Sequence, residues 1–184
     1  QVCPRYIDLL EDSGITFVQG CVEAIDLHQR QVMLASGTDY FYAYLVLAVG
    51  SVINYFGIEG AKAHSWPFRT QDDAFDLSTH LRGCLQQAIR TDDSAERCKL
   101  LTVALMGGGP SGVELAGTLG DLLPKWYSQM GGDPREIRIV LFEQHRELLQ
   151  GDINNYVRDI AGEALQQRTI PIDLKLEHTV TAVE

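Results

Sequence analysis

The segment LLTVALMGGGPSGVEL, residues 100–115, is the most informative part of the sequence. Its first part, Leu100–Met106, is a short and mostly apolar run of the kind found in strands that are covered on both faces of a parallel sheet. A glycine-rich turn follows directly, and Val113–Leu123 has the pattern of a helix. A glycine turn between a buried strand and a helix is typical of a phosphate-binding loop. We therefore expect an α/β protein built around this unit.

The glycines of this turn follow the spacing Gly-x-Gly-x-x-Gly. Gly107 permits the tight turn out of the strand, Gly109 lets the backbone approach a pyrophosphate, and Gly112 lets the helix pack close to the strand. The start of the helix would offer free N–H groups and a partial positive charge to the phosphates. A glycine turn that binds no ligand is the alternative. The cofactor-binding loop that we predict consists of Gly107, Gly108, Gly109, Pro110, Ser111 and Gly112.

The rest of the second part of the chain continues the alternation of strands and helices. A helix is expected over residues 71–90 with Thr70 as its N-cap, and residues 91–97 form a polar link. Beyond the loop, Ile137–Phe142 predicts a strand, Asp152–Gln167 a helix and Ile170–Leu176 another strand. This order is that of a doubly wound, Rossmann-like parallel sheet.

The first part of the chain has a different organisation. A short helix is expected over residues 4–13, followed by a strand at Ile15–Gln19. Val22–Leu27 and Gln31–Ala35 predict two arms of an antiparallel meander, and Tyr44–Val49 predicts a central strand buried on both faces. The first part therefore contains a β-meander and a strand.

Glu143 directly follows the strand that ends at Phe142. An acidic residue there binds the adenosine ribose hydroxyls of NAD and repels the 2′-phosphate of NADP. The interval from Gly112 to Glu143 exceeds the roughly 20 residues that are usual, and residues 124–134 account for the excess as an extension between helix and strand. Arg146 could instead hold a 2′-phosphate, and Glu143 could be a solvated strand end. NAD is the favoured ligand.

Other chemistries are not supported. Gly112 is followed by Val113 and Glu114, so the Lys-Ser/Thr pair of a P-loop is missing, and so is the Gly-x-Ser-x-Gly nucleophile elbow. The four cysteines form no CxxC pair, and the histidines lack metal-ligand spacing, so no metal is expected. Glu114 stands out as a carboxylate expected in the first helical turn, where interaction with the helix dipole is its simplest explanation.

Composition excludes further classes. The 184 residues include 15 Lys and Arg against 25 Asp and Glu, a net charge of −10, which disfavours nucleic acid and anionic membranes as partners. The apolar run 41–53 is far shorter than a membrane span, and no signal peptide is evident. The chain starts without Met, near what is expected to be a helix, and it stops in an expected strand. We therefore expect a piece of a longer protein.

Five stretches together resemble one family. The glycine loop and the start of its helix, residues 107–117, are similar to the NAD-binding domain of FAD-dependent pyridine nucleotide-disulfide oxidoreductases, and most like that of type II NADH dehydrogenases (NADH:quinone oxidoreductases). Residues 44–51 are similar to the strand that closes the first FAD-binding segment, residues 20–26 to the strand that edges the FAD adenine, and residues 56–60 and 69–74 to the crossover into the NAD domain.

The resemblance implies a division of labour along the chain. Residues 1–65 would be the C-terminal part of the first FAD-binding segment, and residues 66–184 an NAD(P)-binding domain truncated at its C-terminal end. NADH would bind the glycine loop and pass a hydride to FAD, which would reduce a quinone. Glu114 would lie near the nicotinamide and flavin as the catalytic residue. Val22, Ala48 and Gly50 would contact FAD.

Departures from the family pattern leave alternatives open. The chain has no FAD-type Gly-x-Gly-x-x-Gly before residue 107, so it is expected to bind FAD weakly or not at all and to be inactive alone. A disulfide, ferredoxin or sulfide:quinone reductase of the same superfamily, or a non-catalytic NADH-binding module, are the alternatives. The expected location is cytoplasmic, with attachment of the parent enzyme to the cytoplasmic face of a membrane left open, as is homo-oligomer formation.

Overall fold

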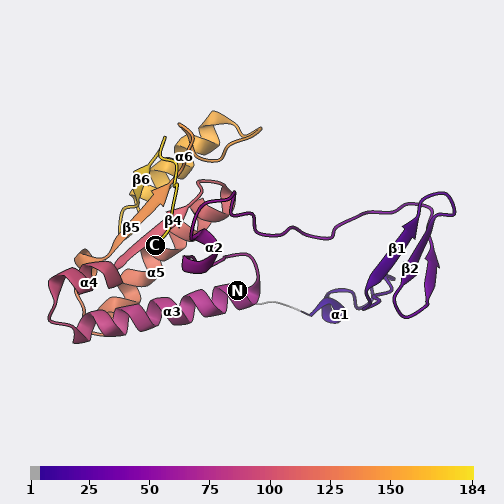
Figure 1. The fold of residues 1–184 in the computed structure, drawn as a ribbon, viewed down its shortest axis with the longest axis horizontal. Helices are drawn as coiled ribbons and strands as arrows, with labels where there is room; N and C mark the ends of the chain where they lie inside the picture. Colours follow the sequence, from indigo (N-terminus) through magenta and orange to yellow (C-terminus); the bar gives the residue numbers. More distant parts are fainter. Residues whose placement is uncertain (1–4) are drawn as a thin grey trace. The chain divides into compact units, whose positions relative to one another are not determined.

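The computed structural model describes residues 5–184, which divide into two compact units (Figure 1). The first unit extends to Ser51 and the second covers Val52–Glu184. The first contains a small antiparallel sheet, and the second contains a parallel sheet with its helices. The expected boundary between residues 65 and 66, which separates the FAD-binding segment from the NAD(P)-binding domain, stays a prediction.

The first unit is built on a three-stranded antiparallel sheet. Helix α1 (Tyr6–Leu9) precedes strands β1 (Val22–Asp26), β2 (Gln31–Leu34) and β3 (Asp39–Phe41). The order is β1-β2-β3, with Ile25 opposite Val32 and Val32 opposite Tyr40. At the first turn, Oδ1 of Asp26 accepts the N–H groups of residues 28 and 29, both at 2.8 Å. The predicted meander is confirmed.

Two strands expected in the first unit are absent from its described residues. Residues 15–19 form no strand, and neither do residues 44–49. Tyr44 is 95% exposed and Val49 88% exposed, so the expectation of a buried central strand is wrong for this chain. A continuous apolar run forms a buried strand only where neighbouring strands supply hydrogen bonds and cover. No strand among residues 5–184 pairs with this run.

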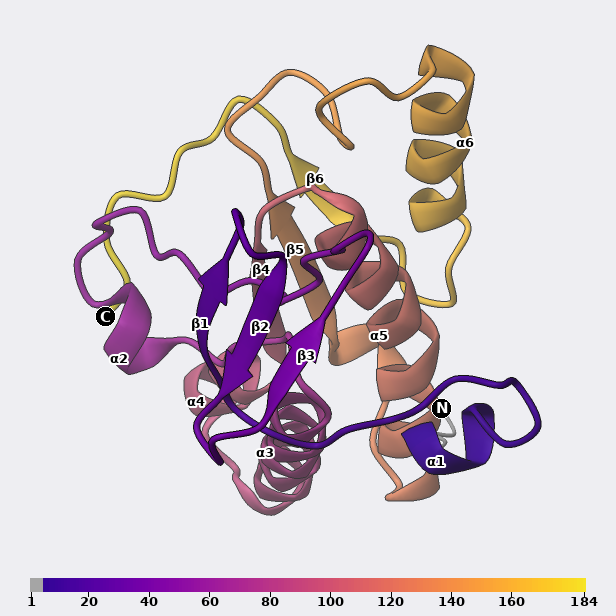
Figure 2. The same ribbon diagram turned by 90° about the vertical axis from the view of Figure 1, so that its right-hand side faces the viewer.

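The second unit holds the predicted parallel sheet. Strands β4 (Thr102–Met106), β5 (Arg138–Phe142) and β6 (Asp173–Lys175) lie in the order β4-β5-β6. All three strands run parallel, with Leu105 opposite Leu141 and Leu141 opposite Leu174 (Figure 2). Met106 and Phe142 lie side by side at the carboxyl ends of β4 and β5. The fold of this unit is therefore Rossmann-like.

Helices α2 (Ala61–His64) and α3 (Gln71–Arg90) come before the sheet. Thr70 caps α3 as predicted, since its side chain accepts the N–H of Asp73 while the Asp73 carboxylate accepts the N–H of Thr70. Helix α4 (Ser94–Leu100) begins in the expected polar link and includes Leu100, so strand β4 starts later than expected, at Thr102. The N-cap of α4 is Asp93, whose side chain accepts the N–H groups of residues 95 and 96. The charged composition of α4 suggested a link and not a helix. The only helix signal in the sequence was Asp93, a residue type that is favoured at the N-cap.

Helix α5 (Pro110–Gln129) is longer than the sequence predicted at both ends. Pro124 lies inside it, buried, and does not end it. Proline lacks the N–H that would bond to the carbonyl of Gly120, four residues earlier. That carbonyl accepts the N–H of Ile170 instead, at 3.0 Å. A partner from a distant segment thus satisfies the group that the proline leaves open.

The expected extension over residues 124–134 is mostly the end of α5. After Gln129 the chain turns at Gly131 and Gly132 and forms the 3₁₀ helix η1 (Pro134–Glu136), which leads into β5. An added Cβ at Gly132 would lie 2.3 Å from the Tyr127 ring, so this close turn requires glycine. Glu143 is thus separated from Gly112 by a helix longer than usual.

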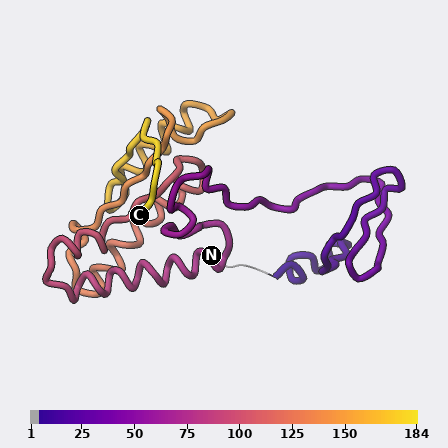
Figure 3. Tube along the Cα trace, in the orientation of Figure 1, coloured from indigo at the N-terminus to yellow at the C-terminus, as the bar shows by residue number. Residues whose placement is uncertain are grey.

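The core lies between the sheet and the helices. Helix α5 packs against β4 and β5, and helices α3 and α6 (Asn155–Gln166) pack against α5. The largest fully buried side chains are Leu101, Leu123, Tyr127, Ile139, Leu141 and Ile172. The C-terminal segment lies beside the residues before α2, where Glu59 and Ala182 form an isolated parallel bridge (Figure 3).

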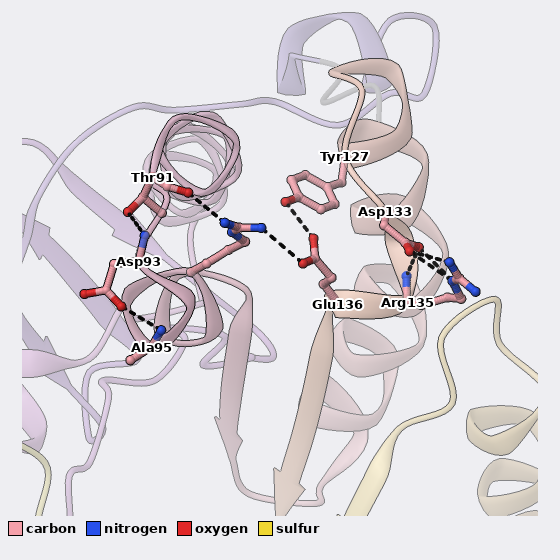
Figure 4. A network of polar contacts seen from close by, with 8 residues as sticks. Thr91, Asp93, Ala95, Tyr127, Asp133, Arg135 and Glu136 are labelled. Carbon is pink, nitrogen blue, oxygen red and sulfur yellow. Dashed lines mark hydrogen bonds and ion pairs between the residues drawn. The ribbon is translucent and has the colours of Figure 1, made fainter.

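A polar network joins the helices at the amino end of β5 (Figure 4). Nη2 of Arg97 donates to the carbonyl of Thr91 at 2.9 Å, and its Nη1 lies 3.6 Å from Oε1 of Glu136. The hydroxyl of buried Tyr127 donates to Oε2 of Glu136 at 3.2 Å. Burial raises the pKa of Tyr127, and the charge of Glu136 raises it further. The network ties α4 and α5 to the entry of β5.

Within residues 5–184, no helix is both long and apolar enough to cross a membrane.

Candidate functional site

The glycine loop leaves β4 in the conformation that the sequence predicted. Gly107 has φ +103°, a region that side chains disfavour, and its N–H donates to the carbonyl of Phe142 at 2.9 Å. Gly109 has φ −72°, and a Cβ added there would meet nothing within 4 Å. The space beside Gly109 is therefore open to a ligand that approaches the backbone.

Gly112 is required for a reason that differs from the expected one. A Cβ at this position would lie 1.9 Å from the carbonyl oxygen of Gly107, whereas the nearest side-chain atom of the sheet, on Leu141, would be 3.8 Å away. The clash is thus with the loop itself. Gly112 lets the first turn of α5 close over the start of the loop, and contact with the strand is secondary.

The amino end of α5 is available to an anion. Gly109 is the N-cap and provides no side-chain acceptor, and Pro110 takes the first helical position, where its missing N–H costs nothing. The N–H of Val113 bonds back to Gly109. The N–H groups of Ser111 and Gly112 have no partner within the helix by its geometry. Together with the helix dipole they form a site suited to phosphate.

Glu143 lies against this loop and is only 8% exposed. Its Oε2 accepts the N–H of Gly108 at 2.7 Å, and its Oε1 accepts the N–H of His145 at 2.9 Å. Burial alone would raise the pKa of Glu143, but the hydrogen bonds from His145 and Gly108 outweigh it and the pKa lies below its usual value. A carboxylate therefore persists beside the glycine loop, and a solvated strand end does not describe it.

Sequence reasoning missed the contacts that hold this carboxylate and the neighbouring Gly108 in place. Nδ1 of His145 lies 2.5 Å from Oε1 of Glu143. Leu149 donates its N–H to the carbonyl of Gly108 at 2.8 Å, and Leu148 is packed so closely that a Cβ on Gly108 would lie 2.7 Å from its Cδ2. Buried Leu148 and Leu149 gave an apolar signal after the strand, but nothing in the sequence singled out His145.

Arg146, the cation considered for a 2′-phosphate, points to another carboxylate. Its Nε lies 3.4 Å from Oε1 of Glu177, and both side chains are exposed. An exposed pair of this kind contributes little to stability. Arg146 thus stays in contact with solvent, directly after His145 and three residues after Glu143 in the loop, and its role toward a phosphate stays a prediction.

Glu114 lies elsewhere on α5 than expected. Because the helix begins at Pro110, Glu114 belongs to its second turn, and no acidic residue lies in the first. The expected interaction of Glu114 with the helix dipole is therefore not supported, because that interaction is confined to the first turn. Glu114 is exposed and lines an open groove of about 720 Å³ between α5 and α6, together with Lys125 and Arg168. Its assignment as the catalytic residue stays a prediction.

Val22, Ala48 and Gly50, which the resemblance assigns to FAD, lie in the first unit. Val22 pairs with Leu34 at the edge of the meander, and Ala48 and Gly50 lie on the exposed extended segment. No glycine loop leading into a helix lies among residues 5–51, so this unit alone does not build a phosphate site for FAD. Within the described part of the chain, no cluster of three acidic, His or Cys side chains could hold a metal ion.

Comparisons with known proteins agree on one family. A family model described as pyridine nucleotide-disulphide oxidoreductase matches residues 6–184. The whole chain is 34% identical to 41% of the demethylphylloquinone reductase NdbB of Synechocystis sp.. Over 77% of its length it is 30% identical to 34% of the type II NADH:quinone oxidoreductase of Staphylococcus aureus. The chain therefore spans less than half of either relative.

Solved structures show the same fold. The NDH2 of Plasmodium falciparum, solved in complex with NADH, superposes with a TM-score of 0.64 over 91% of this chain and 34% of the other, at 22% identity.

Proposed function

The chain belongs to the pyridine nucleotide-disulphide oxidoreductase family, and from that premise we propose that it carries the NADH-binding part of a flavin-dependent NADH dehydrogenase. Residues 66–184 are the proposed NAD(P)-binding domain, and residues 1–65 the end of the first FAD-binding segment. One observation supports NADH binding above the others: a buried carboxylate, Glu143, lies hydrogen-bonded to an open glycine loop. This pairs a ribose acceptor with a phosphate site.

Each part of the site would bind a different part of the dinucleotide. The N–H groups of Ser111 and Gly112 would bind the pyrophosphate, with Gly109 letting it approach. Glu143 would accept hydrogen bonds from the adenosine ribose and would repel a 2′-phosphate, which favours NADH over NADPH. Its lowered pKa supports this role, because the carboxylate keeps its charge at neutral pH.

The chemistry beyond NADH binding rests on the longer protein. FAD, when bound there, would accept the hydride of NADH, and Val22, Ala48 and Gly50 are the proposed contacts of this chain with FAD. Glu114 is the proposed catalytic residue near the nicotinamide. The names of the Synechocystis and Staphylococcus relatives support a quinone as the acceptor. The cytoplasm is the proposed location, and a homo-oligomer the proposed assembly.

Binding of NADH by the 184-residue chain tests the proposal. Calorimetric titration of the native chain should give saturable binding, and Gly109→Val should weaken it by about 10- to 100-fold, the size of one or two lost charge-assisted hydrogen bonds. Since a Cβ at Gly109 meets nothing, the variant should keep its fold. Gly162→Val is the matched control, because Gly162 in α6 also faces open space.

Two outcomes would contradict the proposal. One is no NADH binding by the folded native chain, and the other is equal binding by the native chain and Gly109→Val. The purified chain should also lack stoichiometric flavin absorbance, since residues 5–51 contain no phosphate loop for FAD. A yellow, flavin-loaded preparation would contradict the expectation that this chain alone binds FAD weakly or not at all.

A further inference from the structure

His145 occupies a position that NADH binding alone does not explain. Its Nδ1 lies 2.5 Å from Oε1 of Glu143, which also accepts the N–H of His145, while Gly108 donates to Oε2. A carboxylate has about four acceptor positions. Three are therefore in use before any ligand arrives. Two of the donors are backbone groups, and the imidazole is the one side chain among the three.

The two side chains differ in exposure. Glu143 is 9% exposed at its side chain, and His145 is 48% exposed. The imidazole is thus in contact with solvent, while the carboxylate that it contacts faces the loop where the ribose would lie. Histidine is the side chain whose charge normally changes between about pH 5 and 8. His145 is therefore the solvent-exposed member of the pair that holds the carboxylate beside the loop.

We propose that His145 is a positioning residue that sets the dinucleotide preference of this site through its protonation. Neutral His145 donates from Nδ1, holds the carboxylate and leaves it negative, so the site accepts a ribose diol and repels a 2′-phosphate. Protonated His145 offsets that charge, and the site then admits the 2′-phosphate of NADPH. This inference rests on the proposed function, because it deepens the ribose role of Glu143.

The charged side chains around the His145–Glu143 pair bind to other groups. The segment after β6 packs on it through the backbone, where Glu177 donates its N–H to the carbonyl of His145 and His178 donates its N–H to the carbonyl of Glu143. The charged and titratable side chains nearby have partners of their own: Arg146 with Glu177, Glu147 with Arg158, Lys175 with Asp173, and His178 with the carbonyl of Leu176.

The test compares NADH and NADPH affinity of the 184-residue chain at about pH 5.5 and about pH 8, on either side of the usual histidine range. The 2′-phosphate itself gains a proton over this range, so a variant must isolate the part due to His145. His145→Gln keeps a hydrogen-bond donor but cannot titrate. His178→Gln is the matched control, because its ring contacts Leu176 and not Glu143.

As the pH falls, the affinity for NADPH relative to NADH should rise about two- to fivefold more in the native chain than in His145→Gln, the size expected for a partly exposed charge pair. His178→Gln should behave as native. His145→Lys, with a permanent charge, should accept NADPH equally at both pH values once the change seen in His145→Gln is subtracted.

The outcomes separate the two proposals. If the native chain and His145→Gln bind NADH but show the same pH dependence of the NADPH to NADH ratio, the inference about His145 is wrong and the proposed function stands. If the folded native chain binds no dinucleotide at either pH, the proposed function itself fails.

Discussion

Strand β5 has a glutamate just beyond each of its ends, and the two are held in different ways. Glu136, at the amino end, is bound by side chains, the Tyr127 hydroxyl and the Arg97 guanidinium. Glu143, at the carboxyl end, accepts backbone N–H groups from Gly108 and His145. The partners of Glu136 are thus side chains of neighbouring helices, whereas the donors to Glu143 are backbone groups of an open loop.

The difference follows from the topology of parallel sheets. Ligands bind outside the carboxyl ends of the strands, where loops leave backbone groups free, and the amino ends serve stability. Glu143 accepts from Gly108 in the open loop, whereas Glu136 ends η1 and contacts Arg97 of α4 and Tyr127 of α5 (Figure 4). Substitutions at the carboxyl end should therefore change binding, and those at the amino end should change only stability.

The largest effect is expected at Gly112, because this residue of the predicted binding loop is also required for the fold of the loop. Gly112→Ala places a Cβ 1.9 Å from the carbonyl oxygen of Gly107, so the loop must shift. We expect a loss of about 2–4 kcal/mol in the free energy of unfolding, with loss of NADH binding. Urea unfolding measures the first and titration the second. Gly162→Ala, in open space on α6, should be as stable as native or more so. A native-like unfolding curve for Gly112→Ala would contradict the loop geometry.

The next prediction compares the two glutamates directly. Glu143→Gln removes the negative acceptor at the ribose and should weaken NADH binding by about tenfold, while NADPH binding falls less. Glu136→Gln is its matched partner at the other end of β5 and should leave NADH binding unchanged. Titration of both variants with both dinucleotides checks this. If Glu136→Gln lost as much NADH affinity as Glu143→Gln, the amino end of β5 would also contribute to binding, contrary to this prediction.

A smaller effect is expected for the amino end alone. Tyr127→Phe removes the hydroxyl that donates to Glu136 but keeps the buried ring. The free energy of unfolding should fall by about 0.5–1.5 kcal/mol, the range for one hydrogen bond, with NADH affinity as in the native chain. Chemical denaturation measures it. An unchanged midpoint would mean that the hydroxyl adds nothing to the network.

The smallest effect is the pH dependence of stability at Glu143. Its pKa in the folded chain lies below the usual value because hydrogen bonds from His145 and Gly108 outweigh burial. The stability that this carboxylate contributes is therefore fully present above the pKa of the unfolded chain and is lost as the pH falls through the lower, folded pKa. Thermal unfolding from about pH 6 to about pH 3 should show a shallower decline for Glu143→Gln than for the native chain. Parallel curves would contradict the lowered pKa.

The parts of the molecule that the sequence predicted correctly depend on local patterns. The strand, glycine loop and helix at residues 100–123, the Thr70 cap and the β1–β2 meander follow from composition and short spacings. The proximity of Glu143 to the loop followed from the sheet topology that those patterns implied. In each case the interactions that decide the structure lie near one another in the chain or at one sheet edge.

The errors depend on partners that lie far away in sequence, or on the geometry of a loop. Residues 44–49 have the same apolar character as β4, but no strand of the described chain covers them. The length of α5 depends on Ile170, about 50 residues beyond Gly120 and outside any helical pattern. His145 contacts Glu143 through loop geometry that no residue spacing encodes. Local patterns therefore predicted the elements but neither their limits nor the support of the site.

Pro124 has a consequence for how the sheet is completed. By withholding its N–H it leaves the Gly120 carbonyl as an acceptor on the side of α5, and Ile170 binds it just before β6. Asp121, the next residue, accepts from Thr169 and Arg168 in the same turn. Helix α5 thus carries a docking point for the segment that feeds the third strand. Proline usually ends a helix. Here Pro124 instead frees a carbonyl of α5 that binds the segment before β6, and this bond helps to align β6 with β5.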